Sequence, residues 1–262
     1  MRSKVRLTLI AVAVGTLLAG VTAVGNAIAN GENVANGTYR FSAALSMPEI
    51  TRPDGSKYAS ACSGALIAAD WVITAGHCLH DGARNRISGK PRYEVLVTVG
   101  RATLSGTGGE TRRVVTVRQS ATQDVALVKL DRPVRVQPAI IATAPPTVGE
   151  TLRITGWGSA DAEADLSHRP DRMQTGLMKV TSFNTNGMLV DGIAPQTTTS
   201  ACPFDSGAPY FRYVNNRYVI AGTEVGGPDC PHNSNETTTR LDTIATWILT
   251  YIRGTVPPNN NR

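Results

Sequence analysis

Ser206 lies in the stretch Cys-Pro-Phe-Asp-Ser-Gly-Ala-Pro at residues 202–209, between Asp205 and Gly207. A serine held on a tight turn beside glycine is typical of an exposed nucleophile. Its hydroxyl attacks poorly until an adjacent base, usually a histidine oriented by a carboxylate, removes its proton. The chain must therefore also supply a histidine and an acid for this serine to do acyl-transfer chemistry.

The chain has four histidines: His77, His80, His168 and His232. His77 ends the apolar run 71–76, where a loop can present it to a cleft. The other three lie in polar sequence typical of surface histidines. Asp124 precedes the apolar run 125–130. Alone it reads as a solvated turn residue, and together with His77 it is a candidate to orient the base.

Four motifs in this order resemble the trypsin/chymotrypsin-like serine proteases, and among them the secreted bacterial members: Thr74-Ala75-Gly76-His77-Cys78, Asp124-Val125-Ala126-Leu127, Gly156-Trp157-Gly158 and residues 202–209. The likeness extends over about residues 28–252. It implies peptide-bond hydrolysis through an acyl-enzyme, with His77 as general base and then acid, Asp124 as its orienter and Ser206 as nucleophile.

The resemblance also assigns an oxyanion hole to the backbone N–H groups of Phe204 and Ser206. Phe204 stands where the family usually has glycine, which adopts a positive φ at little cost. Two outcomes follow: the loop is rebuilt at a tolerable φ, or the oxyanion hole is incomplete. The ring of Phe204 then contacts the leaving-group side of a substrate or simply covers the cleft edge.

In this family a new N-terminal amine is buried against the aspartate before the nucleophile, here Asp205. Cleavage after Ala27 would make Ile28 that terminus and secretion would yield the active form, whereas cleavage after Ala29 would remove it. The stretch 28–31 resembles the family's mature start, although its second and third residues differ. We expect Ile28 to be the mature terminus.

The residues that match the substrate pocket of the family are Ser200, Gly226, Gly227 and Glu236. Ser200, at the pocket base, predicts an apolar or undemanding pocket. Glu236 occupies a wall position that is usually glycine, and a carboxylate there would bind Arg or Lys. It could equally narrow the pocket or face solvent. The balance favours a basic preference.

Four cysteines allow three disulfide connectivities. Sequential pairing, Cys62 with Cys78 and Cys202 with Cys230, is the simplest, and the resemblance supports it. Zinc ligation around the His-Cys-Leu-His stretch at 77–80 is the alternative, disfavoured because no acidic ligand is nearby. We expect no metal and no cofactor.

The first 27 residues carry three basic residues and then an apolar run that ends in small residues, which indicates a secretory signal peptide. A membrane anchor is the alternative, but glycines dilute the run. Part of the formal net charge of +6 belongs to this segment, and no basic run follows that would indicate a nucleic-acid binder. We expect a secreted, monomeric protein without stable membrane association.

The rest of the chain consists of short β-type runs separated by turns, which predict an all-β protein. The first run, 39–46, is expected to stop at Met47-Pro48, and Asn215-Asn216 predicts a hairpin. The resemblance implies two six-stranded antiparallel β-barrels, at about 28–137 and 138–241, within a protease domain of residues 28–254. Apolar spacing predicts a helix at about 242–253 capped by Asp242, and residues 255–262 are expected to be a disordered tail.

The sequence thus predicts a serine endopeptidase that acts on proteins or peptides and is open to protein inhibitors. The alternative is a catalytically weak homologue that binds a protein partner in the same cleft, suggested by Phe204 and the altered pocket wall. The intact set of His77, Asp124 and Ser206 favours the enzyme, since a binding protein needs no such set.

Overall fold

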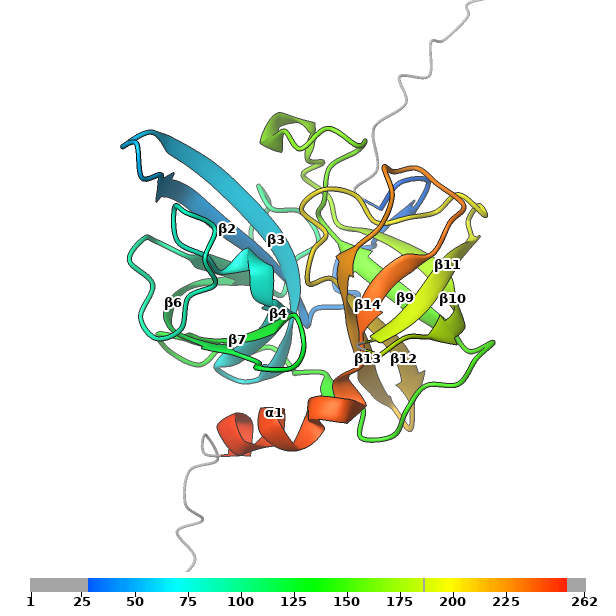
Figure 1. The fold of residues 1–262 in the computed structure, drawn as a ribbon. Coiled ribbons are helices and arrows are strands. Elements are labelled where there is room, and N and C mark those ends of the chain that lie inside the picture. Colours follow the sequence, from blue (N-terminus) through cyan, green and yellow to red (C-terminus); the bar gives the residue numbers. More distant parts are fainter. Residues whose placement is uncertain (1–27, 186, 254–262) are drawn as a thin grey trace, which may run out of the picture.

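Two β-barrels lie side by side in the computed structural model, which describes residues 28–185 and 187–253 (Figure 1). The segments expected to be a signal peptide, 1–27, and a tail, 255–262, fall outside the described residues. Strands dominate both barrels, and the predicted fold class is confirmed. None of the described helices is long and apolar enough to cross a membrane.

The first barrel is closed by six antiparallel strands in the order β2-β3-β4-β7-β6-β5, with β5 pairing back to β2. Their bounds are β2 (Ser42–Thr51), β3 (Lys57–Ala68), β4 (Trp71–Ala75), β5 (Leu96–Val99), β6 (Glu110–Gln119) and β7 (Val125–Leu130). Pro48 lies inside β2, so the expected stop is wrong. The register shifts between Met47 and Ile50, and this irregularity accommodates a proline that cannot donate a ladder hydrogen bond.

The second barrel has the order β10-β11-β14-β13-β12-β9 and is closed by pairing of β9 with β10. Its strands are β9 (Thr151–Gly156), β10 (Gln174–Phe183), β11 (Gly187–Ala194), β12 (Pro209–Val214), β13 (Arg217–Gly226) and β14 (Glu236–Thr239). Two-residue strands β1 (Glu32–Asn33) and β8 (Ile140–Ile141) pair with β10 and β13. Asn215 and Asn216 have φ of 49° and 59°, so the predicted β12–β13 hairpin is confirmed.

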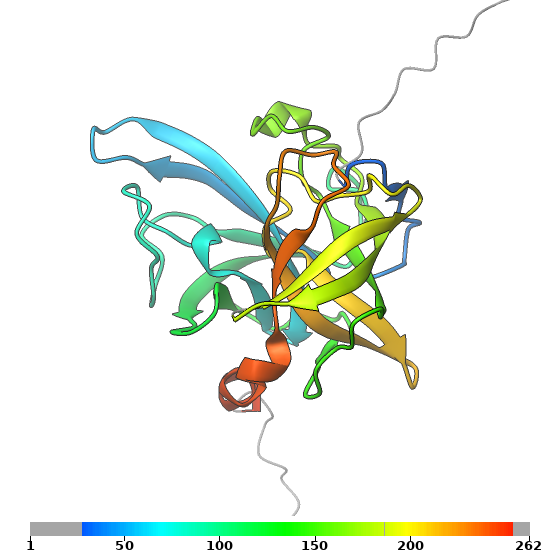
Figure 2. The ribbon, with the colours of Figure 1, turned by 45° about the vertical axis from the view of Figure 1, so that its right-hand side comes forward.

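Each end of the described chain packs on the barrel formed by the other half (Figures 1 and 2). Ile28 is buried in the core of the second barrel, and β1 follows along β10. At the other end, η3 (Leu241–Ile244) leads into α1 (Ala245–Ile252), whose Ile248 joins the core of the first barrel. Asp242 does not cap the helix: it lies in the 3₁₀ turn η3 and pairs with Arg240. The helix therefore begins later than its apolar spacing predicts.

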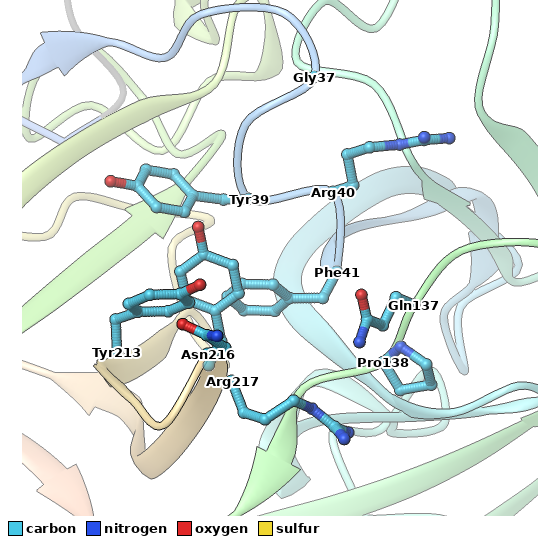
Figure 3. Close-up of a pocket in the computed structure, with 10 residues that line it drawn as sticks. Gly37, Tyr39, Arg40, Phe41, Gln137, Pro138, Tyr213, Asn216 and Arg217 are labelled. Atoms are coloured by element: carbon cyan, nitrogen blue, oxygen red, sulfur yellow. The ribbon is translucent and has the colours of Figure 1, made fainter.

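Aromatic rings join the two barrels on the face shown in Figure 3. The ring of Phe41 lies 5.0 Å from that of Phe211 and Tyr39 lies 5.2 Å from the same ring, in edge-to-face contacts that add stability beyond burial. Tyr218 completes this group. None of the predicted site residues lines the hollow beside these rings (Figure 3). Its lining residues are Gly37, Tyr39, Arg40, Phe41, Gln137, Pro138, Tyr213, Asn216, Arg217 and Tyr218. The packed rings beside this hollow help to hold the two barrels together.

Candidate active site

His77 and Asp124 come from paired strands of the first barrel. Antiparallel pairing of β4 with β7 sets Ala75 opposite Val125, so the residues just beyond these strand ends are neighbours. His77 lies in the 3₁₀ turn η1 (Gly76–Cys78). Its Nδ1 is 2.6 Å from Asp124 Oδ2, and its backbone N–H donates to Asp124 Oδ1 at 2.9 Å. Both contacts orient the imidazole ring.

Ser206 reaches the same point from the second barrel. Its Oγ lies 2.8 Å from Nε2 of His77. Its carbonyl accepts a hydrogen bond from Ser63 N–H of β3 at 3.0 Å, which ties the serine loop to the first barrel. Gly207 has φ of +83°, and a Cβ there would overlap Thr74 and the carbonyl of Ser63. The three residues predicted as a triad therefore lie together between the barrels.

Arg86 braces the carboxylate of Asp124 from behind. Its Nη1 lies 3.8 Å from Asp124 Oδ1, while Nε and Nη2 donate to Gln119 Oε1 at 2.9 and 2.7 Å. Gln119 in turn donates to the carbonyl of Gly76 at 2.9 Å. Burial alone would raise the pKa of Asp124, but hydrogen bonds and charge from His77, together with Arg86, hold it below the usual value. This arrangement keeps Asp124 ionised.

Phe204 keeps the turn that a glycine would make. Its φ is +74°, in the left-handed region, and Asp205 N–H donates to the carbonyl of Cys202 at 3.0 Å across it. A side chain in this region costs about 1–2 kcal/mol. The loop therefore keeps a positive φ at Phe204. The expected outcome in which the loop is rebuilt at a φ that phenylalanine tolerates is wrong. Among residues 28–185 and 187–253, none accepts from the backbone N–H of Phe204 or Ser206.

Asp205 is fully buried beneath the serine loop. Its carboxylate accepts from Gly158 N–H at 2.8 Å and Cys202 N–H at 3.1 Å. A Cβ on Gly156 or Gly158 would overlap this carboxylate, which explains the two glycines around Trp157. Burial raises the pKa of Asp205 well above its ordinary value, against the lowering effect of these donors and of Arg169. A nearby positive charge would favour the ionised form.

Ile28 lies beside this loop. It is buried in one apolar cluster with Ala201 and Ala208, which flank the nucleophile. Ala29 N–H donates to the carbonyl of Ser200 at 2.9 Å and fixes the segment against the second barrel. Ile28 therefore packs against the residues that flank the serine loop.

A cavity of about 190 Å³ opens on one side of Ser206. Gly226 and Gly227 line it, as predicted. A Cβ on Gly226 would meet nothing within 4 Å, whereas one on Gly227 would overlap the carboxylate of Glu236. The strand end at Gly226 therefore leaves the cavity open, and Gly227 lets Glu236 approach from behind.

Ser200 and Glu236, the other two predicted pocket residues, do not line this cavity and lie behind Ala201 and Gly227. Ser200 is buried, and its Oγ accepts from the backbone N–H of His232 at 3.3 Å. Glu236 Oε1 accepts from Ala201 N–H at 2.7 Å and lies 3.2 Å from Nε2 of His232. Glu236 is 1% exposed, so of the three readings of this residue the solvent-facing one is wrong.

Glu224 is a lining residue that the sequence reasoning did not single out. It projects from β13 into the wall of the cavity that Ser206 borders. It is 2% exposed, and its Oε2 accepts from Tyr210 Oη at 2.5 Å. A glutamate in a strand that ends in two glycines carries no spacing signal. The segment 223–227 matches the pocket wall of the family, but only the pairing of β13 with β12 and β14 shows that the Glu224 side chain faces the cavity.

A second hollow, of about 410 Å³, lies on the other side of Ser206. His77, Phe204 and the Cys62–Cys78 pair are among its lining residues. Its outer wall carries Tyr58, with the guanidinium of Arg52 4.1 Å from the ring centroid. Ser206 thus lines both hollows and lies between them.

The cysteines pair as predicted, Cys62 with Cys78 and Cys202 with Cys230. The thiol of the zinc alternative, Cys78, is therefore bonded to sulfur. The surface interpretation of the other histidines is wrong for His80, which is buried and whose pKa is lowered chiefly by burial. His168 pairs with Asp161 at 3.0 Å on the exposed side.

Comparison with known proteins agrees with this geometry. A family model described as Trypsin matches residues 28–248. Vitamin K-dependent protein C of Rattus norvegicus is 27% identical over 232 residues, which cover 75% of this chain and 47% of that protein. The Mus musculus protein of the same name is 24% identical over 223 residues, with the same coverage of 75% and 47%. Thrombin-like enzyme elegaxobin-1 of Protobothrops elegans is 25% identical over 215 residues, 74% of this chain and 86% of that protein. The chain spans about half the length of the two protein C relatives.

Proposed function

Because the chain belongs to the trypsin family of serine hydrolases, we propose that it is a secreted serine endopeptidase that cleaves proteins or peptides through an acyl-enzyme. The observation that carries the proposal is the 2.8 Å contact between His77 Nε2 and Ser206 Oγ, with Asp124 on the other ring nitrogen. The site residues assigned from sequence keep their roles in this proposal.

In the first step Ser206 Oγ attacks the substrate carbonyl carbon while His77 Nε2 takes the hydroxyl proton. The resulting oxyanion accepts hydrogen bonds from the N–H groups of Phe204 and Ser206, which are free for it. The C–N bond then breaks as His77 returns the proton to the leaving amine. Water repeats the sequence on the acyl-enzyme, releases the acid and restores Ser206.

Activation in this proposal depends on the mature terminus at Ile28. A free α-amine there would bring a positive charge to Asp205, whose carboxylate is buried and whose pKa is raised by burial. Secretion through removal of residues 1–27 would generate this amine directly. N-terminal sequencing of the secreted protein checks it: a mature start at Asn30 instead of Ile28 would contradict this activation step.

Labelling with a fluorophosphonate probe tests the enzymatic function. We expect the folded wild-type protein to be labelled and Ser206→Ala to lose the label. Ser46→Ala is the matched control, because Ser46 is exposed on β2 in the first barrel and should not affect labelling. A folded wild-type protein that stays unlabelled would favour the alternative, a homologue that only binds a protein partner in the cleft.

A further inference from the structure

Two buried glutamates lie at the cavity beside Ser206: Glu224 lines it, and Glu236 lies behind Gly227. Glu224 on β13 is 2% exposed and Glu236 on the neighbouring strand β14 is 1% exposed. Each has one bonded oxygen, held by Tyr210 Oη in one case and by Ala201 N–H in the other. The second oxygens, Glu224 Oε1 and Glu236 Oε2, are buried and have no hydrogen-bond partner within the described part of the chain.

No lysine or arginine of residues 28–185 and 187–253 forms an ion pair with either glutamate. A buried carboxylate is costly unless a donor or a cation satisfies it, and two of them near each other are costlier still. Neutral donors satisfy only one oxygen on each. The unmet oxygens therefore point to a cation that arrives from outside the chain.

The groups that face the pair are mostly acidic. Glu224 faces Tyr210 on β12, Glu236 on β14 and, further away, Asp205 of the serine loop. Glu236 faces Asp191 on β11 as well. Tyr210 is kept as a neutral donor, because burial and the neighbouring carboxylates raise its pKa.

His232 is the basic group at this end of the cavity. Its Nδ1 accepts from Ser234 N–H at 3.2 Å, which leaves the ring proton on Nε2, toward Glu236. Burial lowers the pKa of His232, so the ring is uncharged at neutral pH. The cluster therefore has a surplus of carboxylates over positive charges.

Protons supply part of the missing charge while the cavity is empty. Burial raises the pKa of Glu236 to about 7, and burial together with the charge of Glu236 raises the pKa of Glu224 well above its ordinary value. A cation entering between the two would replace the bound protons, which pass to solvent.

The cavity has the place and shape for a substrate side chain. Ser206 and Glu224 both line it, so a residue whose carbonyl is attacked by Ser206 can extend its side chain toward Glu224. The open strand end at Gly226 leaves the entrance free. The volume of about 190 Å³ admits one long side chain rather than two.

We propose that Glu224 is a second specificity-determining carboxylate and that the cavity takes one cationic side chain, arginine or lysine, whose charge is met jointly by Glu224 and Glu236. This inference rests on the endopeptidase function proposed above, since it assigns the cavity to the substrate residue before the cleaved bond. The sequence-based expectation of a basic preference depended on Glu236 alone. The present inference also requires Glu224, the acid on β13. In this arrangement the guanidinium of arginine would bind Glu224 directly, and Glu236 would add negative charge from behind Gly227.

Calorimetric titration with benzamidine, an amidinium cation, and with benzamide, its neutral isostere, tests the inference. The Ser206→Ala background prevents self-digestion. At about pH 8 we expect benzamidine to bind at least about tenfold more tightly than benzamide. Glu224→Gln and Glu236→Gln should each reduce this ratio by about tenfold. Glu49→Gln is the matched control, because its side chain is 59% exposed and lies on β2 of the first barrel.

The same titration in two buffers of different ionisation heat measures proton release. We expect benzamidine, and not benzamide, to release protons, and the release to fall in each glutamine variant. A ratio that Glu224→Gln leaves unchanged would overturn the role of Glu224, even if Glu236→Gln lowers it. Thermal unfolding shows whether the variants fold. If they do not, the protein without the glutamine substitutions still tests the inference: equal affinities for benzamidine and benzamide, with no proton release, would refute it.

The probe labelling described above separates this result from the proposed function. Benzamidine selectivity in a protein that resists the fluorophosphonate would keep the cation site and refute the hydrolase. Labelling without selectivity would do the reverse.

Discussion

The backbone N–H of Ser159 donates a 2.6 Å hydrogen bond to the carbonyl oxygen of Pro203. In a trans peptide the carbonyl and the next N–H point in opposite directions, so this bond turns the N–H of Phe204 away from Ser159. The peptide plane is therefore held by a bond that needs no glycine at position 204, provided that the residue there keeps a positive φ. This explains how a phenylalanine can stand where the family has glycine.

Substitution of Phe204 tests this relationship. Phe204→Gly relieves the left-handed conformation and keeps the N–H, so we expect kcat to stay within about threefold of the wild type. Phe204→Val puts a β-branched residue at φ of +74° and should turn the N–H out of place. Losing one such donor lowers kcat by about 10²–10³. Turnover of a peptide ester by folded variants checks both, and equal kcat for glycine and valine would contradict it.

Removal of Arg86 should weaken the support of Asp124. Arg86→Met deletes the guanidinium 3.8 Å from Asp124 and the bonds to Gln119, so the pKa of Asp124 should rise. We expect kcat/KM to fall by about three- to tenfold and its acid limb to move to higher pH. A pH profile distinguishes this from a purely structural effect. Arg113→Met, at a side chain 70% exposed, is the matched control and should leave the profile unmoved.

Glu236 should make stability depend on pH. Its pKa is raised from 4.5 to about 7, so the folded state binds its proton more tightly than the unfolded state. Stability from this group is fully present below about pH 4.5 and is lost as the pH rises to about 7, by up to about 3 kcal/mol. Glu236→Gln should remove that loss. Urea unfolding at about pH 5 and pH 8, in the Ser206→Ala background, measures it.

In that comparison the free energy of unfolding of Glu236→Gln should fall less between the two pH values than that of the wild type. An identical fall in both proteins would show that Glu236 is ionised in the folded state without cost. His232 titrates in the opposite sense, because its pKa is lowered, and a His232→Gln variant separates the two contributions.

The two disulfides should differ in what their loss does to the cavity. Cys202–Cys230 spans 28 residues and Cys62–Cys78 spans 16, so each should contribute about 3–4 kcal/mol by restricting the unfolded chain. Cys202 and Cys230 line the cavity beside Ser206, whereas the other pair lines the second hollow. Replacing each pair by alanine should cost similar stability, measured by urea unfolding. Benzamidine binding should weaken far more in the Cys202/Cys230 variant.

Much of the site could be predicted because its residues lie in short sequence motifs. His77, Asp124 and Ser206 each sit beside glycine, cysteine or a strand start that marks a tight turn, and the structure brings them together. The Asn215-Asn216 turn is equally local. Such features depend on neighbours in the chain, so the sequence alone contains them.

The missed features depend on contacts between distant segments. Strand β11 contains Gly187 and Gly192, which read as loop residues, yet a Cβ on them would overlap the carbonyls of Thr238 and Thr199. Glu224 reads as an ordinary polar strand residue until β12 and β14 enclose it. The close approach of the backbone at these glycines and the burial of Glu224 arise only in the assembled barrel. No local residue spacing predicts them.

The crossing of the two chain ends has a consequence for when activity can arise. The segment at Ile28 is seated in the second barrel, and α1, which ends at Ile252, is seated on the first. The base and the nucleophile sit on different barrels, and their alignment needs both barrels formed and both ends docked. A chain that lacked α1 and β14 would leave both barrels incomplete. In the proposed function, the alignment of His77 with Ser206 therefore waits until both ends of the described chain are docked.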